Sequence, residues 1–161
     1  MFKVGEVVFC PKRGIGTVEG IETRTMLNES NEYMIVHMKS PELTMMIPVD
    51  RIETSGFRAL NNVEAVKEVE MILKNKEVQV DHSMDIKKRI KQNQEKLSSG
   101  SFLECGEVVR DLTCMEKIKA LNNSERTILS QAKRFLVDEF ASIQSLSDEQ
   151  AEETIDRLLE I

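Results

Sequence analysis

Residues 2–25 read FKVGEVVFCPKRGIGTVEGIETRT, and this stretch decides how the first part of the chain folds. Short runs rich in Val, Ile and Thr alternate here with Gly and Pro, which favours β-strands separated by turns. We expect a first strand at residues 4–9 and a second at residues 15–25. The segment Pro11–Gly14 between them has Pro early and Gly late, as a tight turn prefers.

The same pattern continues to about residue 59. Two further β-prone runs lie at residues 32–38 and 43–49, and residues 27–31 form a polar tip before the first of them. A short fifth strand is expected at residues 55–59. Short strands with turn signals between them are typical of a small antiparallel barrel or meander.

From Asn61 onward the apolar residues recur with the period of an α-helix. The spacing predicts five helices, at about residues 63–73, 85–97, 101–119, 124–144 and 147–159. Asn61 or Asn62 would cap the first of them. We therefore expect an α+β protein, with a small N-terminal Tudor-like antiparallel β-barrel at residues 1–56 and an all-helical domain of about five helices at residues 57–161.

Two Ser residues are expected to begin helices through a capping box. Ser101 precedes Glu104 by three positions, and Ser147 precedes Gln150 by the same spacing. In a capping box each side chain binds the other residue's free backbone N–H group. The sequence predicts this arrangement at both places.

Composition restricts the class of protein. Of the 161 residues, 40% are hydrophobic and 31% charged, which is enough apolar surface for a core and argues against disorder. No apolar run approaches the roughly 20 residues of a membrane helix, and Glu6 comes too early for a signal peptide. We expect a cytoplasmic protein that does not contact membranes.

Signatures of catalysis and of metal binding are missing from the sequence. It contains no phosphate-binding loop, no dinucleotide fingerprint and no nucleophile elbow. Cys10, Cys105 and Cys114 fit no zinc spacing, so we expect three buried or half-buried thiols. We therefore expect no cofactor, no metal and no enzymatic activity.

Charge is distributed unevenly along the helical half. Residues 87–96 hold five cations and one anion, whereas residues 138–161 hold eight acidic residues and one Arg. Arg126, Lys133 and Arg134 form a second basic set. Such polarity would steer a polyanion to one end of this half, although an ordinary solvated surface is an equally open interpretation of a basic run.

One strand of the β half carries adjacent Met residues. Thr44 and Met46 share one face of the expected strand, and Met45 lies on the other. An exposed Met near a sheet edge would suit a protein contact because its thioether adapts to irregular surfaces. The alternative is that both Met side chains fill the small core.

Several of these segments together resemble the CarD family of transcription regulators, also called CdnL. In the β half the resemblance rests on residues 2–25, on EYMIVHM (32–38) and on LTMMIPV (43–49). In the helical half it rests on EKLSSG (95–100), EVVRDL (107–112) and SERTILSQAKRFLVDE (124–139). The N-terminal part is similar to the RNA-polymerase-interacting domain that this family shares with the transcription-repair coupling factor.

The resemblance implies a function on RNA polymerase. The Tudor-like domain would dock on the lobe of the polymerase β subunit. The helical domain would contact promoter DNA weakly, and without sequence specificity, at the upstream edge of the transcription bubble. There it would hinder bubble collapse, so that the open promoter complex persists, and the protein would be nucleoid-associated.

The resemblance also assigns residues to the two surfaces. Arg24 matches the family's polymerase-contacting Arg, and Met46 stands where the family has a second Arg. The expected polymerase contacts are Arg24, Met26, Thr44 and Met46. The expected DNA contacts are Ile86, Lys87, Lys88, Arg89, Lys91, Arg126, Lys133 and Arg134.

The chain has no Trp, and Ile86 stands at the position where many family members place a Trp wedge. Met84 is the other candidate for this position. Aliphatic side chains can wedge beside an unstacked base step, but Ile lacks a ring face for stacking. We therefore expect weaker bubble stabilisation than a Trp would give.

Three other interpretations stay open at this point. The β half could be a KOW-type or Tudor-like module on ribosomal RNA or on an elongation complex. The chain could bind a protein partner without touching DNA, as the missing Trp and Met46 suggest. It could also form a dimer by swapping strands, a hazard of small domains with edge strands.

Overall fold

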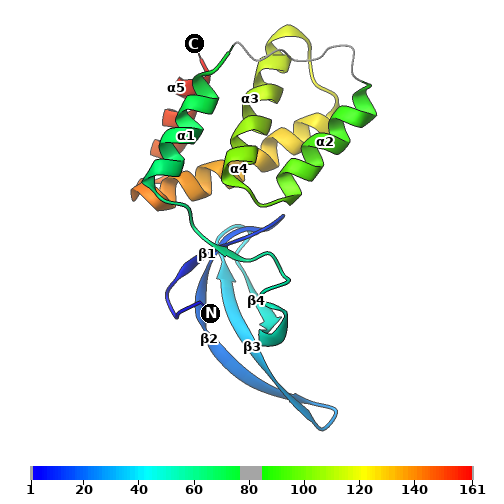
Figure 1. Ribbon diagram of the computed structural model, residues 1–161, viewed down its shortest axis with the longest axis vertical. Coiled ribbons are helices and arrows are strands. Elements are labelled where there is room, and N and C mark those ends of the chain that lie inside the picture. The colour runs from blue at the N-terminus through cyan, green and yellow to red at the C-terminus, as the bar shows by residue number, and fades with distance from the viewer. Residues whose placement is uncertain (1, 77–84, 161) are drawn as a thin grey trace. The chain divides into compact units, whose positions relative to one another are not determined.

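The computed structural model describes residues 2–76 and 85–160. The chain divides into two compact units, Met1–Leu60 and Asn61–Ile161. The described residues of the first unit form a five-stranded antiparallel sheet, and those of the second form five α-helices (Figure 1). The predicted α+β fold, with the β part first, is confirmed.

The sheet has the spatial order β4-β3-β2-β1-β5, so its first four strands form a meander and β5 lies beside β1. A short 3₁₀-helix, η1 (Val49–Arg51), follows β4. All strand pairs are antiparallel. The strands are β1 (Val7–Cys10), β2 (Gly14–Met26), β3 (Glu29–Met38), β4 (Leu43–Pro48) and β5 (Arg58–Ala59).

Three strands are shorter than predicted. The first strand begins at Val7 rather than Val4, because Gly5 adopts a positive φ of 86° and the chain turns there. The fourth strand ends at Pro48, and Val49 already belongs to η1. The fifth contains only Arg58 and Ala59.

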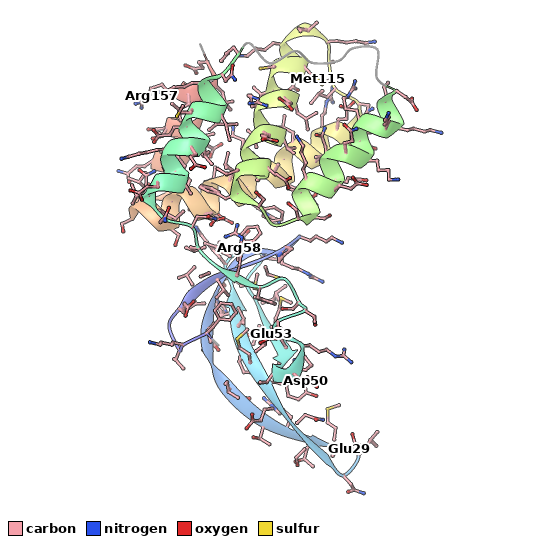
Figure 2. The ribbon with its side chains drawn as sticks, in the orientation of Figure 1. Glu29, Asp50, Glu53, Arg58, Met115 and Arg157 are labelled. Atoms are coloured by element: carbon pink, nitrogen blue, oxygen red, sulfur yellow. The ribbon has the colours of Figure 1, made fainter. Side chains whose placement is uncertain are left out.

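The expected polar tip between β2 and β3 is also shorter than predicted. Only Leu27 and Asn28 form the turn, both with positive φ, and Glu29 already pairs with Met26. Strand β4 pairs with β3 only as far as Tyr33, so the rest of the hairpin continues as a two-stranded ribbon (Figure 1). Glu29 lies near its far end in Figure 2.

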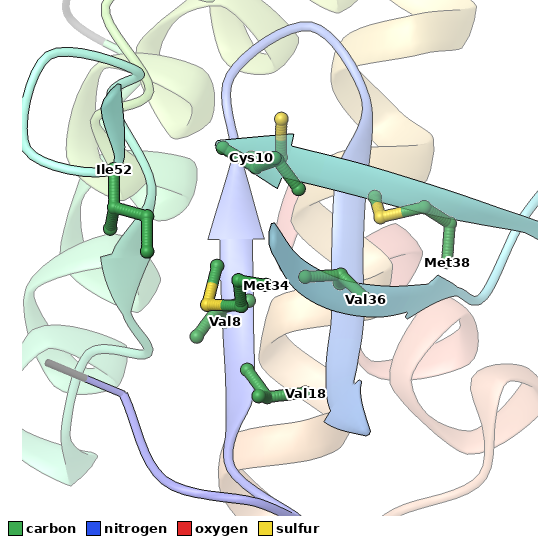
Figure 3. Packing of buried hydrophobic residues seen from close by; sticks show 8 residues of the cluster. Val8, Cys10, Val18, Met34, Val36, Met38 and Ile52 are labelled. Atoms are coloured by element: carbon green, nitrogen blue, oxygen red, sulfur yellow. The ribbon is translucent and has the colours of Figure 1, made fainter. Parts of the chain in front are cut away.

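One face of the sheet carries the core of this unit (Figure 3). Gly16 of β2 is needed there, because a Cβ on it would lie 2.7 Å from the Met38 sulfur and 2.7 Å from a Val36 methyl group. A side chain at this position would overpack the core. The buried cluster consists of Val8, Cys10, Val18, Met34, Val36, Met38, Ile47 and Ile52.

The helical unit is built around its longest helix, which packs against the other four. The helices are α1 (Val63–Lys74), α2 (Ile86–Ser98), α3 (Phe102–Ile118), α4 (Asn123–Gln144) and α5 (Asp148–Leu159). Phe135, Leu136 and Phe140 of α4 are fully buried. Val63, the first residue of α1, is exposed.

Side-chain caps begin most of these helices. Asn62 caps α1 and Asn122 caps α4, each accepting a bond from the backbone three residues on. The predicted capping box is complete at Ser147, where Gln150 bonds back. At Ser101 only half of it forms, because the Glu104 carboxylate accepts a bond from Ser99 instead.

Within residues 2–76 and 85–160, no helix combines the length and the apolar character that crossing a membrane requires.

Candidate functional site

Arg24, Met26, Thr44 and Met46 lie on the face of the sheet opposite to the core. The strand register shows this, because directly opposed residues of an antiparallel pair project to the same side. Met46 stands opposite Ile35, whose neighbours on β3 point into the core. The remaining pairs on this face are Thr44 with His37, Arg24 with Asn31 and Met26 with Glu29.

These four residues form two groups rather than one cluster. Their partners on β3, Asn31 and Ile35, are four residues apart, which corresponds to about 13 Å along a strand. Arg24 is already paired with Glu22 on the same strand, at 2.8 Å between exposed side chains. An exposed ion pair of this kind contributes little to stability, so the guanidinium can exchange partners at small cost.

The two adjacent Met side chains have different environments. Met45 packs against the core cluster of the sheet, whereas the side chain of Met46 is 43% exposed. The structure therefore decides between the two interpretations of this pair: one Met fills the core and the other is accessible.

Strand β4 lies at one edge of the sheet, and β5 at the other, in the part of the chain that the structure describes. A free edge presents backbone N–H and C=O groups that can pair with a strand of another protein. Because β4 also carries Met46 and Thr44, the accessible side chains and the accessible edge coincide.

The basic run of the helical unit lies at the start of α2. Lys87, Lys88 and Lys91 are exposed, and Ile86, the first residue of the helix, is 49% exposed. Met84, the alternative wedge residue, lies outside the described residues. Three cations and one apolar side chain therefore share the first turns of this helix.

Arg89 has a different environment from the other cations of the run. Its Nε and terminal nitrogen donate to the two carboxylate oxygens of Glu125 at 2.9 and 2.8 Å. The side chains of Arg89 and Glu125 are only 16% and 2% exposed. Arg89 thus joins α2 to the first turn of α4.

The second basic set, Arg126, Lys133 and Arg134, also contains one cation in an interhelical ion pair and others that are exposed. Lys133 bonds to Asp156 of α5 at 2.7 Å and lies 3.6 Å from Glu152. Arg134 is exposed and covers the Phe135 ring at 5.0 Å. Arg126 is exposed in the first turns of α4. Of this set, Arg126 is the cation nearest in sequence to the Arg89–Glu125 bridge.

Sequence reasoning missed a surface pocket of about 530 Å³ beside Ile86. Residues from α2, from the end of α3, from the following loop and from the first turn of α4 line it, and Figure 2 shows Met115 on α3. The one signal in the sequence was an apolar Ile118 at the end of a helix. The lining residues are Ile86, Arg89, Met115, Ile118, Lys119, Ala120, Leu121, Asn122 and Glu125.

The three thiols lie where the sequence predicts buried or half-buried cysteines. Cys10 and Cys105 are buried and Cys114 is half-buried. Burial raises the pKa of the Cys10 thiol, and the nearby Arg13 opposes this only partly. A thiol with a raised pKa is a poor nucleophile at neutral pH. Among the described residues no group of three His, Cys, Asp or Glu side chains could hold a metal.

Comparison with known proteins accounts for both units. Residues 2–60 match the family model described as the CarD-like/TRCF RID domain, and residues 68–156 match that of the CarD C-terminal domain. The chain belongs to the CarD family. Both halves of the chain thus carry the domains of a family of transcription factors, not of a known class of enzyme, and the RID match implies interaction with RNA polymerase.

A curated relative agrees with this assignment. The chain is 35% identical to a Bacillus subtilis (strain 168) protein named "Putative transcription factor YdeB". The match extends over 150 residues, which is 93% of this chain and 97% of that protein. The likeness therefore covers both units rather than a single shared domain.

Proposed function

We propose that this CarD-family protein docks on the β-subunit lobe of RNA polymerase through its sheet and stabilises the open promoter complex through its helical unit. The observation that carries the proposal is that each of the two units has an accessible surface of its own. One is the outer face and free edge of the sheet, and the other is the basic start of α2.

The sheet offers what a protein partner needs. The β4 edge can accept a strand, and the exposed Met46 beside it can pack into a shallow apolar surface. Arg24 supplies a charge on the same face. Because Met46 replaces the second Arg of the family pattern, we expect an interface that is more apolar and less salt-dependent.

The helical unit fits weak contact with a DNA backbone. Lys87, Lys88, Lys91, Arg126 and Arg134 are exposed, so only about five phosphate contacts are available from this set. Few contacts give low affinity with a strong dependence on salt. The acidic residues of α5 would repel DNA from that helix, which leaves the start of α2 as the contact surface.

Ile86 supplies the non-electrostatic part of the proposed contact. It is half-exposed in the first turn of α2, next to the cations that would hold the phosphates. An aliphatic side chain there can lie against an unstacked base step at the edge of a bubble. Contact of this kind recognises a junction between duplex and single strands rather than a sequence. Acting on promoters, the protein would be cytoplasmic and nucleoid-associated.

Co-elution with RNA polymerase on size exclusion tests the docking step. We expect the wild-type protein to co-elute at micromolar concentration and the Arg24→Glu variant to elute separately. Arg51→Glu is the matched control, because Arg51 is an exposed Arg of the same unit that follows β4. Equal co-elution of Arg24→Glu and wild type would remove Arg24 from the interface. The elution volume of the free protein also shows whether it forms a strand-swapped dimer.

A second candidate function is partner binding without DNA contact. The ion pairs of Arg89 and Lys133 favour it, because they occupy two of the expected DNA-binding cations within the fold. Salt-dependent binding of the purified protein to a forked promoter fragment would exclude this alternative. The alternative would be supported if the protein binds polymerase and neither added DNA nor substitution of the α2 lysines changes that binding.

A further inference from the structure

The pocket beside Ile86 has features that the proposed function does not use. Its walls are the aliphatic side chains of Ile86, Met115, Ile118 and Leu121. Its volume, about 530 Å³, lies within the roughly 300–1,000 Å³ typical of sites for small organic groups. A planar group of the size of one nucleobase fits such a space, whereas a duplex does not.

The surroundings of the pocket are mostly positive. Lys119 lines it, and Lys87, Lys88 and Arg126 are exposed neighbours of the lining residues in the sequence. Two exposed carboxylates, Asp85 and Glu116, adjoin the lining in the same way. The charges of Arg89 and Glu125 cancel within their ion pair. The exposed charges on and next to the lining residues therefore sum to a positive value, which favours an anionic ligand.

One side chain on the pocket wall can recognise a polar edge. The Asn122 Oδ1 atom accepts a bond from the Glu125 backbone N–H at 2.8 Å, which fixes the orientation of the amide. Its amide nitrogen is the donor end of the same group. The Glu125 carboxylate oxygens are bonded to Arg89, so this ion pair forms a rigid part of the lining.

From this combination we propose that the pocket takes up one unpaired base of a DNA strand. The aliphatic walls would hold the base, and the cations at the opening would hold the phosphates on either side of it. Pockets that receive an extruded base combine apolar contact with its faces and polar groups at its edge. The inference rests on the proposed function, since it places the captured base beside Ile86 at the edge of the bubble.

The test compares a forked DNA that has an unpaired base at the junction with one that has an abasic nucleotide there. The wild-type protein should bind the intact fork about three- to tenfold more tightly at low salt. With 2-aminopurine as the unpaired base, emission should rise on binding, because aliphatic walls separate the base from its stacked neighbours without quenching it.

Two surface variants make the test specific. Ile118→Ser removes one aliphatic wall, and its matched control is Met71→Ser, since Ile118 and Met71 are 70% and 72% exposed and both lie in the last turn of a helix. Ala120→Leu fills the pocket from an exposed position. We expect Ile118→Ser and Ala120→Leu to lose the preference for the intact fork, and Met71→Ser to keep it.

Placing the abasic nucleotide in a promoter separates failure of this inference from failure of the proposed function. The protein should lengthen the lifetime of an open complex on the intact promoter more than on one with an abasic nucleotide at the upstream edge. Equal lengthening on both would overturn base capture and leave the proposed function standing. Lengthening on neither would overturn both.

Discussion

Arg89 and Glu125 form a two-bond ion pair that ties the first turn of α2 to the first turn of α4. The distances are 2.9 and 2.8 Å, and the carboxylate is almost fully buried. The backbone N–H of Glu125 also donates the cap bond to the Asn122 side chain. The orientation of Lys87, Lys88 and Ile86 therefore depends on a contact with another helix.

Removing the carboxylate should destabilise the helical unit. In Glu125→Gln the Arg89 guanidinium stays largely buried without a charged partner. We therefore expect a loss of about 2 to 4 kcal/mol in the free energy of unfolding. Urea unfolding followed by far-ultraviolet circular dichroism measures it. Glu107→Gln is the control, because its ion pair with Lys96 is about one third exposed and should contribute under about 1 kcal/mol. Equal losses in the two variants would contradict the structural role of Arg89.

The exposed lysines of α2 should determine how DNA binding depends on salt. Each lost phosphate contact lowers the slope of log affinity against log salt by about one. Lys88→Ala with Lys91→Ala should therefore reduce the slope for a forked promoter fragment by about two. The double variant Lys67→Ala, Lys74→Ala removes two exposed lysines from α1 and should leave the slope unchanged. Lys133→Ala should change it little, because Asp156 already holds that ammonium group.

A ring at the wedge position should strengthen bubble stabilisation. Ile86→Trp adds a flat face for base stacking at a half-exposed position, so the fold should tolerate it. Stacking on an aromatic ring is worth about 1–3 kcal/mol per base, and we expect at least a several-fold longer open-complex lifetime. An unchanged lifetime would mean that Ile86 does not contact the bubble edge.

The tip of the β2–β3 hairpin should be a point of low stability. Leu27 has a φ of +52° and its side chain is 98% exposed, a conformation and an exposure that both disfavour Leu. Leu27→Asn should stabilise this unit by about 0.5–1 kcal/mol, because Asn tolerates the left-handed region. Tyr33 is the single Tyr and the chain has no Trp, so Tyr fluorescence during unfolding reports on the sheet alone. A loss of stability would contradict the turn geometry.

Local sequence signals predicted most elements of the fold. The turn signals around Gly14 separated the first strands, and the helical period with the cap at Ser147 located the last helix. The signals failed where long-range pairing extends an element. Residues 29–31 look like a polar loop, but they are a strand because they pair with residues 24–26 of β2.

For the candidate site, the sequence predicted which side chains share a face of a strand, but not which residues form ion pairs. Because side chains alternate between the two faces of a strand, the sequence predicted Thr44 and Met46 on one face of β4, and the register agrees. The partners of Arg89 and Lys133 lie on other helices, at Glu125 and Asp156, and no local pattern connects them. The pocket beside Ile86 likewise needs α2, the end of α3, the loop after it and the start of α4 to meet, so it appears only in the folded chain.

The central claim is that the protein, held on polymerase by its sheet, prolongs the life of open promoter complexes. The most direct test is the decay of preformed open complexes after a competitor is added, with wild type and with Arg24→Glu at concentrations that saturate wild-type binding. We predict slower decay with the wild-type protein and decay at the rate of polymerase alone with Arg24→Glu. Decay that the wild-type protein leaves unchanged would contradict the account.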